Sequence, residues 1–131
     1  MIELYNIGIS ETTIKNMLEI NQEIKELPQE KIKEKVVILN SINCDNNQII
    51  NIISSNPNYL TKTNEEIINL INFLMNYGLK CLNILFDSNP YILNLEPFEI
   101  EEYINNRKIN GEKIEDIIDD LDSNPHLFNE I

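Results

Sequence analysis

The sequence predicts an all-α protein, a short solenoid of about three and a half helix-pair repeats of 33–35 residues, from three observations. An Asn-Pro pair recurs at Asn56-Pro57, Asn89-Pro90 and Asn124-Pro125, in steps of 33 and 35 residues. A further step of 35 backwards reaches Asn21, which keeps the asparagine and lacks the proline. Between these points, apolar residues recur at helical spacing. A period of this size is typical of stacked helical units.

The first unit begins at Ser10, a residue type favoured as a helix N-cap. Ile14, Met17 and Leu18 lie three and four residues apart, which predicts a first helix with one apolar face. After Asn21 we expect a short connector over residues 23–27. The second helix is predicted to start around Pro28 and to end near Ser41, with apolar residues at Ile32, Val36, Ile38 and Leu39.

The second unit repeats this pattern with stronger capping. Asp45 and Gln48 fit a capping box, and the following residues 49–53 are nearly all isoleucine. In isolation this β-branched run would also fit a strand, but the repeat favours a helix. Pro57 ends the helix, because proline has no backbone donor and excludes the α conformation from the preceding residue.

The second helix of this unit starts at another predicted capping box, Thr63 with Glu66. It is expected to close at Gly78, since glycine adopts positive φ without strain. Its predicted core positions are Ile67, Leu70, Ile71, Leu74 and Met75.

The third unit follows at the same spacing. Its first helix is predicted from Leu79, Leu82, Leu85 and Phe86, and its second helix, starting at Pro97, from Phe98, Ile100, Tyr103 and Ile104. Asn110-Gly111 marks a turn. The last unit has an apolar face at Ile114, Ile117, Ile118 and Leu121 but no second helix. Such a half unit either caps the stack or offers a face to a second copy, giving a homodimer.

The length of 131 residues fits one domain, residues 1–131. No amino-terminal signal peptide and no run of about 20 apolar residues is present, so we expect a cytoplasmic protein without membrane contact. Cys44 and Cys81 are expected to be reduced and to act as small apolar residues. The formal net charge of −12 opposes non-specific attraction to nucleic-acid phosphates and favours a protein partner with a basic surface.

The lysines at positions 25, 31, 33 and 35 are the nearest approach to a basic patch, but glutamates are interleaved with them. This pattern predicts a solvated helix face with local ion pairs.

Acidic residues gather between positions 96 and 122. Glu115 with Asp119, and Asp116 with Asp120, are like-charged pairs one helical turn apart, which mildly destabilise a helix. They suggest an acidic surface that imitates the phosphates of nucleic acid, with a solubilising face as the alternative. The candidate partner-binding residues are Glu101, Glu102, Glu112, Glu115, Asp116, Asp119, Asp120 and Asp122.

No pattern for a metal site, a cofactor or catalysis is present. Residues 120–124 begin like a calcium loop, but Pro125 and Ile131 stand where its glycine and glutamate belong. His126 has no cysteine or histidine at metal-ligand spacing, and the three glycines form no phosphate loop. We therefore expect a protein that is not an enzyme.

The chain resembles the mitochondrial transcription termination factor family. The likeness rests on residues 56–60 and 89–93, where Asn-Pro is followed by a leucine three residues after the proline, and on Ile7-Gly8-Ile9-Ser10, which is similar to the family's Leu-Gly-Leu-Ser junction. The resemblance implies a curved, left-handed stack whose concave, basic side binds duplex DNA or structured RNA. The acidic composition departs from that pattern.

Two functions follow. The charge and the lack of catalytic motifs favour a non-enzymatic binding module that acts by protein contact, such as an acidic nucleic-acid-mimicking inhibitor of the kind carried by phages or mobile elements. The alternative, from the resemblance, is a small nucleic-acid-binding regulator of transcription. Salt-dependent binding to nucleic acid distinguishes the two.

Overall fold

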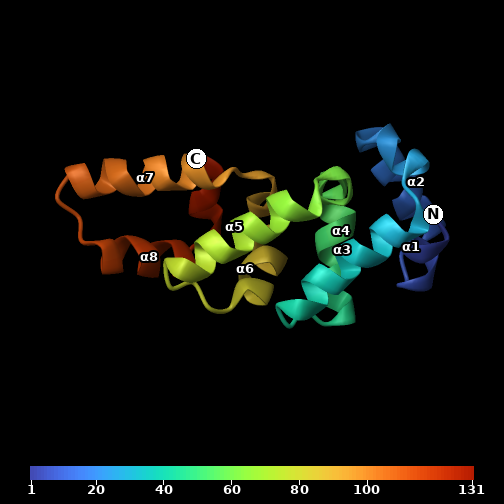
Figure 1. The fold of residues 1–131 in the computed structure, drawn as a ribbon, viewed down its shortest axis with the longest axis horizontal. Helices are drawn as coiled ribbons and strands as arrows, with labels where there is room; N and C mark the ends of the chain where they lie inside the picture. The colour runs from blue at the N-terminus through green and yellow to red at the C-terminus, as the bar shows by residue number, and fades with distance from the viewer.

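The structure is a computed structural model that describes residues 1–131 and contains only helices (Figure 1). The α-helices are α1 (Ile2–Asn6), α2 (Glu11–Ile20), α3 (Gln29–Ser41), α4 (Asn46–Ser55), α5 (Asn64–Asn76), α6 (Leu82–Ser88), α7 (Pro97–Ile109) and α8 (Ile114–Ser123). Four short 3-10 helices lie between them, η1 (Gln22–Glu26), η2 (Pro57–Thr61), η3 (Pro90–Asn94) and η4 (Pro125–Glu130). The predicted all-α repeat is confirmed. None of these helices combines the length and apolarity needed to cross a bilayer.

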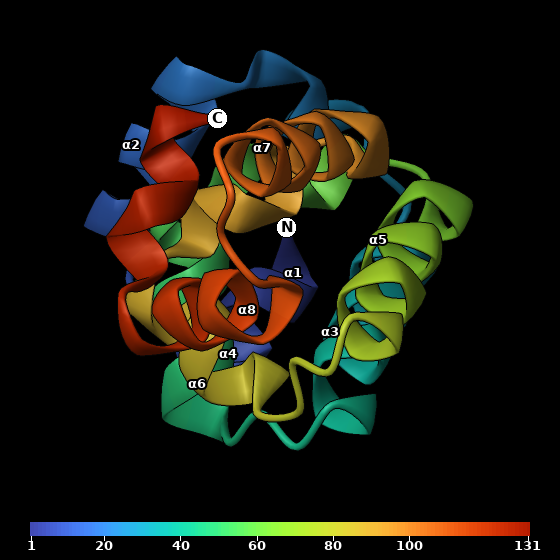
Figure 2. The same cartoon turned by 90° about the vertical axis from the view of Figure 1, so that its left-hand side faces the viewer.

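Each complete unit consists of an α-helix, a 3-10 helix and a second α-helix. Equivalent elements of successive units contact one another, so that α1, α3, α5 and α7 form one row, α2, α4 and α6 a second, and η1 to η4 a third. The units follow one another along the long axis of the molecule, from blue to red in Figure 1. Seen along that axis in Figure 2, α3 and α5 lie on one side and α4, α6 and α8 on another. The left-handed sense of the stack stays a prediction.

Residues 23–26 of the connector predicted over residues 23–27 belong to a regular element, η1, and the same element follows every first helix. Proline occupies the first position of the other three, where its fixed φ suits a helix and its missing N–H costs nothing. The asparagine before each proline closes the turn, as when the Asn56 carbonyl accepts from the Tyr59 N–H at 3.1 Å.

The asparagines themselves join one unit to the next. The Asn56 side-chain amide donates to the Pro90 carbonyl and to Asn94 Oδ1, both at 3.0 Å. Asn89 donates in the same way to the carbonyl of Pro125 and to Oδ1 of Asn129, and Asn21 donates to Thr61 Oγ1. Asn56 and Asn89 are buried, so this ladder of hydrogen bonds belongs to the scaffold.

A residue with positive φ ends every second helix. Gly8, Asn43, Gly78 and Gly111 have φ between 71° and 104° and recur at steps of 35, 35 and 33 residues. The expected closure at Gly78 is confirmed, whereas Asn43 was not predicted; asparagine is one of the few other residues that tolerate this conformation. Helix α1, also not predicted, precedes Gly8 and contacts α3, so it occupies the place of a second helix.

One hydrophobic core runs through all units and contains most of the predicted apolar positions. Met75 and Phe98 are exceptions, with 55% and 64% of their surface exposed. The position of Met75 is taken one repeat later by Lys108, and the position of Phe98 one repeat earlier by Glu65. Both positions face outward in every unit, which explains the error. The predicted capping boxes at Asp45 and Thr63 are both confirmed.

The two cysteines are free but lie in different surroundings. Cys44 is buried, and the burial raises the pKa of its thiol to about 11, whereas Cys81 is exposed and does not act as a core residue. Because the thiolate is the reactive form, we expect one thiol per chain to react with Ellman's reagent at neutral pH and the second only after denaturation. Replacing Cys81 by serine should remove the fast reaction. Two fast thiols in the native protein would contradict this burial.

Candidate nucleic-acid interface

Arg107 divides the predicted acidic surface into carboxylates that are paired within the chain and carboxylates that are not. Its guanidinium binds Glu112, with Nε to Oε2 at 2.8 Å, and also Asp120, with Nη2 to Oδ2 at 3.0 Å. These bonds raise the pKa of Arg107 and lower that of Glu112. Two of the eight candidate residues are therefore paired within the chain, and Asp120 is not the uncompensated charge that the sequence suggested. The other six carboxylates form no ion pair.

Arg107, Glu112 and Asp120 occupy positions that are apolar in the other units. One repeat earlier the same places hold Leu74, Leu79 and Leu85, all buried. Backbone hydrogen bonds support this equivalence between the two units. The Glu112 N–H donates to the Arg107 carbonyl, just as the Leu79 N–H donates to the Leu74 carbonyl one repeat earlier. This charged trio makes the last part of the stack polar, as a cap requires.

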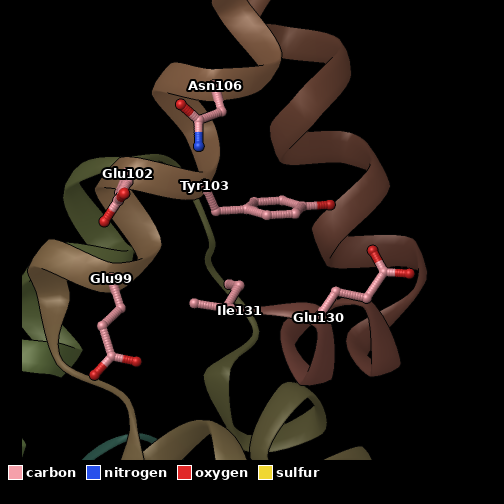
Figure 3. A pocket seen from close by; sticks show the side chains of 6 residues that line it. All are labelled: Glu99, Glu102, Tyr103, Asn106, Glu130 and Ile131. Carbon is pink, nitrogen blue, oxygen red and sulfur yellow. The ribbon is translucent and has the colours of Figure 1, made fainter.

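A hollow of about 280 Å³ lies between α7 and the end of the chain (Figure 3). It is lined by Glu99, Glu102, Tyr103, Asn106, Glu130 and Ile131, and the Tyr103 ring points across it toward the neighbouring helix. Of the candidate acidic residues only Glu102 belongs to it. No group of three or more acidic, histidine or cysteine side chains in the molecule has the geometry of a metal site. The hollow is thus an acidic depression without a ligand set.

Lysines line a second hollow, of about 400 Å³, where the start of α3 meets η2 and the start of α5. Lys31 and Lys35 come from α3 and Lys62 from the residue after η2, and the hydroxyl-bearing Thr61 and Thr63 lie beside them. We call this the lysine hollow. Helix α5 begins here, so the partial positive charge of its N-terminus lies beside the lysines, with Glu65 and Glu66 in the first turn of the helix.

Lys35 is the most unusual of the three, because only 2% of its surface is exposed. Its Nζ donates to Asn64 Oδ1 at 2.6 Å, and the Asn64 amide donates onward to Glu34 Oε2 at 2.8 Å. Burial lowers the pKa of Lys35, and the bond from Asn64 lowers that of Glu34. The chain of bonds fixes the ammonium at the wall of the hollow.

The other two lysines are held less firmly. Lys31 Nζ lies 3.5 Å from Glu34 Oε2, and Lys62 Nζ lies 3.8 Å from Glu66 Oε2. Such loose, partly solvated pairs contribute little stability. The predicted local ion pairs on α3 are therefore confirmed for Lys31 and for Lys33, whose Nζ lies 3.6 Å from Glu30 Oε1. The prediction of a solvated side chain was wrong for Lys35.

The lysine hollow lies in the less acidic half of the chain. Residues 1–62 contain six basic and eight acidic side chains, a net charge of −2, whereas residues 63–131 contain four and fourteen, a net charge of −10. Exposed charges further apart than about 8 Å are largely screened at physiological salt. The overall acidity therefore does not determine the potential at this hollow.

Sequence reasoning passed over Lys35 because its neighbours are charged. The repeat register could have indicated that Lys35 is buried. Lys35 precedes Leu70 by 35 residues, and Leu70 was predicted to be core and is buried. A lysine at a core position is held at a defined place, unlike a lysine on a solvated face.

Comparison with known proteins supports the resemblance. The family model named mTERF matches residues 1–117, which include the whole lysine hollow and every complete helix pair. No curated protein matches the chain. With nearly the full length matched and the helical repeat confirmed, the chain belongs to the mTERF family.

Proposed function

We propose that the chain is a non-enzymatic, nucleic-acid-binding regulator, and that the lysine hollow contacts the phosphate backbone. Membership of the mTERF family supports this function over the acidic inhibitor that the charge alone favoured. The observation that carries the proposal is the convergence of Lys31, Lys35 and Lys62 at the start of α5. Lysine side chains and helix N-termini are both common phosphate contacts, and they position a protein on nucleic acid without reading sequence.

The distribution of charge limits the contact. Phosphates are attracted at α3 and the start of α5, while the unpaired carboxylates of α7 and α8 repel them at the other end. We therefore infer a short footprint and binding that weakens steeply with salt. The acidic surface as a partner-binding site remains a prediction, supported so far only by its six unpaired carboxylates.

The proposal predicts the effect of reversing two charges in the lysine hollow. In gel-shift titrations at low salt with duplex DNA and with structured RNA, K31E/K62E should weaken binding and reduce the slope of log K against log salt by about 2, roughly one per lost phosphate contact. The matched control is K80E together with K113E, an equal change of charge at exposed lysines outside the hollow. No binding at low salt, or an equal loss in the control, would refute the proposed interface.

A further inference from the structure

A groove between α3 and α5 is lined mainly by apolar side chains, with Ser41 and Asn72 as its two polar lining residues. It has a volume of about 310 Å³ and continues toward the start of both helices, where a neighbouring hollow shares Val37, Ile38 and Ile68 with it. The apolar lining residues, which we call the apolar groove, are Val37, Ile38, Ile42, Ile68, Ile71 and Met75.

The apolar groove is open to water. Val37, Ile68 and Met75 have 63%, 45% and 55% of their surface exposed, so three of the molecule's large exposed hydrophobic side chains lie in one depression. The repeat itself does not need apolar residues there. On α7, one repeat later, Glu101 stands at the position of Ile68 and Lys108 at that of Met75. Contiguous exposed apolar surface of this kind marks a binding site.

Charge indicates what occupies the groove. A second copy of this chain would bring another −12 charges against the first, and the surroundings of the groove are acidic: Glu30 and Glu34 line its extension, and Glu101 follows on the next helix of the row. The only cation lining the extension, Lys33, is shared between Glu3 and Glu30 at 3.9 and 3.6 Å, and Lys31, outside the extension, lies 3.5 Å from Glu34. Together with Glu101, these carboxylates outnumber the two lysines. A basic partner complements these surroundings, and a second copy does not.

We propose that the apolar groove binds an amphipathic helix of a protein partner whose polar edges carry lysine or arginine. Helices α3 and α5 have 13 residues each, so the groove between them accommodates about 20 Å of helix, or some four turns. Anchors at i, i+3, i+4 and i+7 would contact Val37, Ile68 and Met75, which is the usual manner in which a helix binds a groove. The apolar groove shares no residue with the lysine hollow, although its extension meets the hollow at Asn64, and the proposal does not depend on the proposed function.

Two synthetic peptides of about 14 residues test the proposal. Both carry the same leucine face, and they differ in having lysine or glutamate on the polar edges. In fluorescence anisotropy with the full chain, the lysine peptide should bind at least about tenfold more tightly than the glutamate peptide, a difference near 1.4 kcal/mol. I68E/M75K, which introduces the residue types found on α7, should weaken that binding by about tenfold or more.

The control is Ile109→Lys, which changes a more exposed apolar side chain outside the groove and should leave peptide binding unchanged. Thermal melts establish that each variant is folded. Equal affinity for both peptides, or full affinity in I68E/M75K, overturns the proposal. So does a dimer of the free protein in light scattering that I68E/M75K dissociates, because the groove would then belong to a second copy.

Discussion

Replacing Asn56 by alanine should lower the free energy of unfolding by about 3 kcal/mol, because the substitution removes two buried hydrogen bonds and leaves their acceptors unsatisfied. The Asn56 amide is 1% exposed and donates to the Pro90 carbonyl and Asn94 Oδ1. Both acceptors belong to η3, so the bonds connect the second and third units. Denaturant titration followed by circular dichroism measures the change, with the slope of the transition showing whether both units still unfold together.

Asn124 provides the matched control, since it holds the same place in the fourth unit but donates no hydrogen bond to another unit. It is exposed, and its amide donates only to Asp120 Oδ1 in its own helix, at 3.3 Å. Asn124→Ala should therefore change stability by less than about 0.5 kcal/mol. If both alanine variants were equally stable, the asparagine would serve only the local turn and the ladder between units would carry no energy.

This asparagine ladder illustrates which parts of the fold the sequence could predict. Helices, caps and the stop at Asn56-Pro57 follow from neighbouring residues, and the capping boxes at Asp45 and Thr63 were predicted correctly. The acceptors of Asn56 lie 34 and 38 residues further along the chain. Nothing local distinguishes such an asparagine from the many others in this composition, so the sequence motif predicts the end of a helix and not a link between units.

The candidate site was harder to predict for a related reason. Charge patterns in sequence are interpreted as if every charged side chain faced water, which holds for Lys31 and fails for Lys35. It fails again for Asp120, whose partner Arg107 lies on a different helix, 13 residues away. Whether a charged side chain is buried or paired depends on how the helices pack against one another, which the local sequence does not show. Comparing each residue with its counterparts one repeat away recovers part of that information, because most scaffold positions keep their burial from unit to unit.

Leu85→Asp should have the largest effect of any substitution considered, lowering stability by more than about 4 kcal/mol. Leu85 is 2% exposed, and the change both removes apolar packing and buries an unpaired carboxylate. Because the marginal stability of a domain is roughly 5–15 kcal/mol, we expect loss of most of the cooperative thermal transition. Circular dichroism melts of the purified variant at pH 7 provide the measurement.

Asp120→Leu is the reciprocal change at the equivalent position and should cost less than about 1 kcal/mol. Asp120 lies at the polar end of the stack with 39% of its side chain exposed, and Arg107 keeps Glu112 as a partner when Asp120 is removed. Leucine has the higher helix propensity, so propensity disfavours Leu85→Asp and favours Asp120→Leu, but only by about 0.5 kcal/mol each, which is much less than the expected difference between the two variants. If Leu85→Asp were tolerated as well as Asp120→Leu, the junction between the third and fourth units would be as accessible to water as the end of the stack. The charged trio of Arg107, Glu112 and Asp120 would then not be a cap.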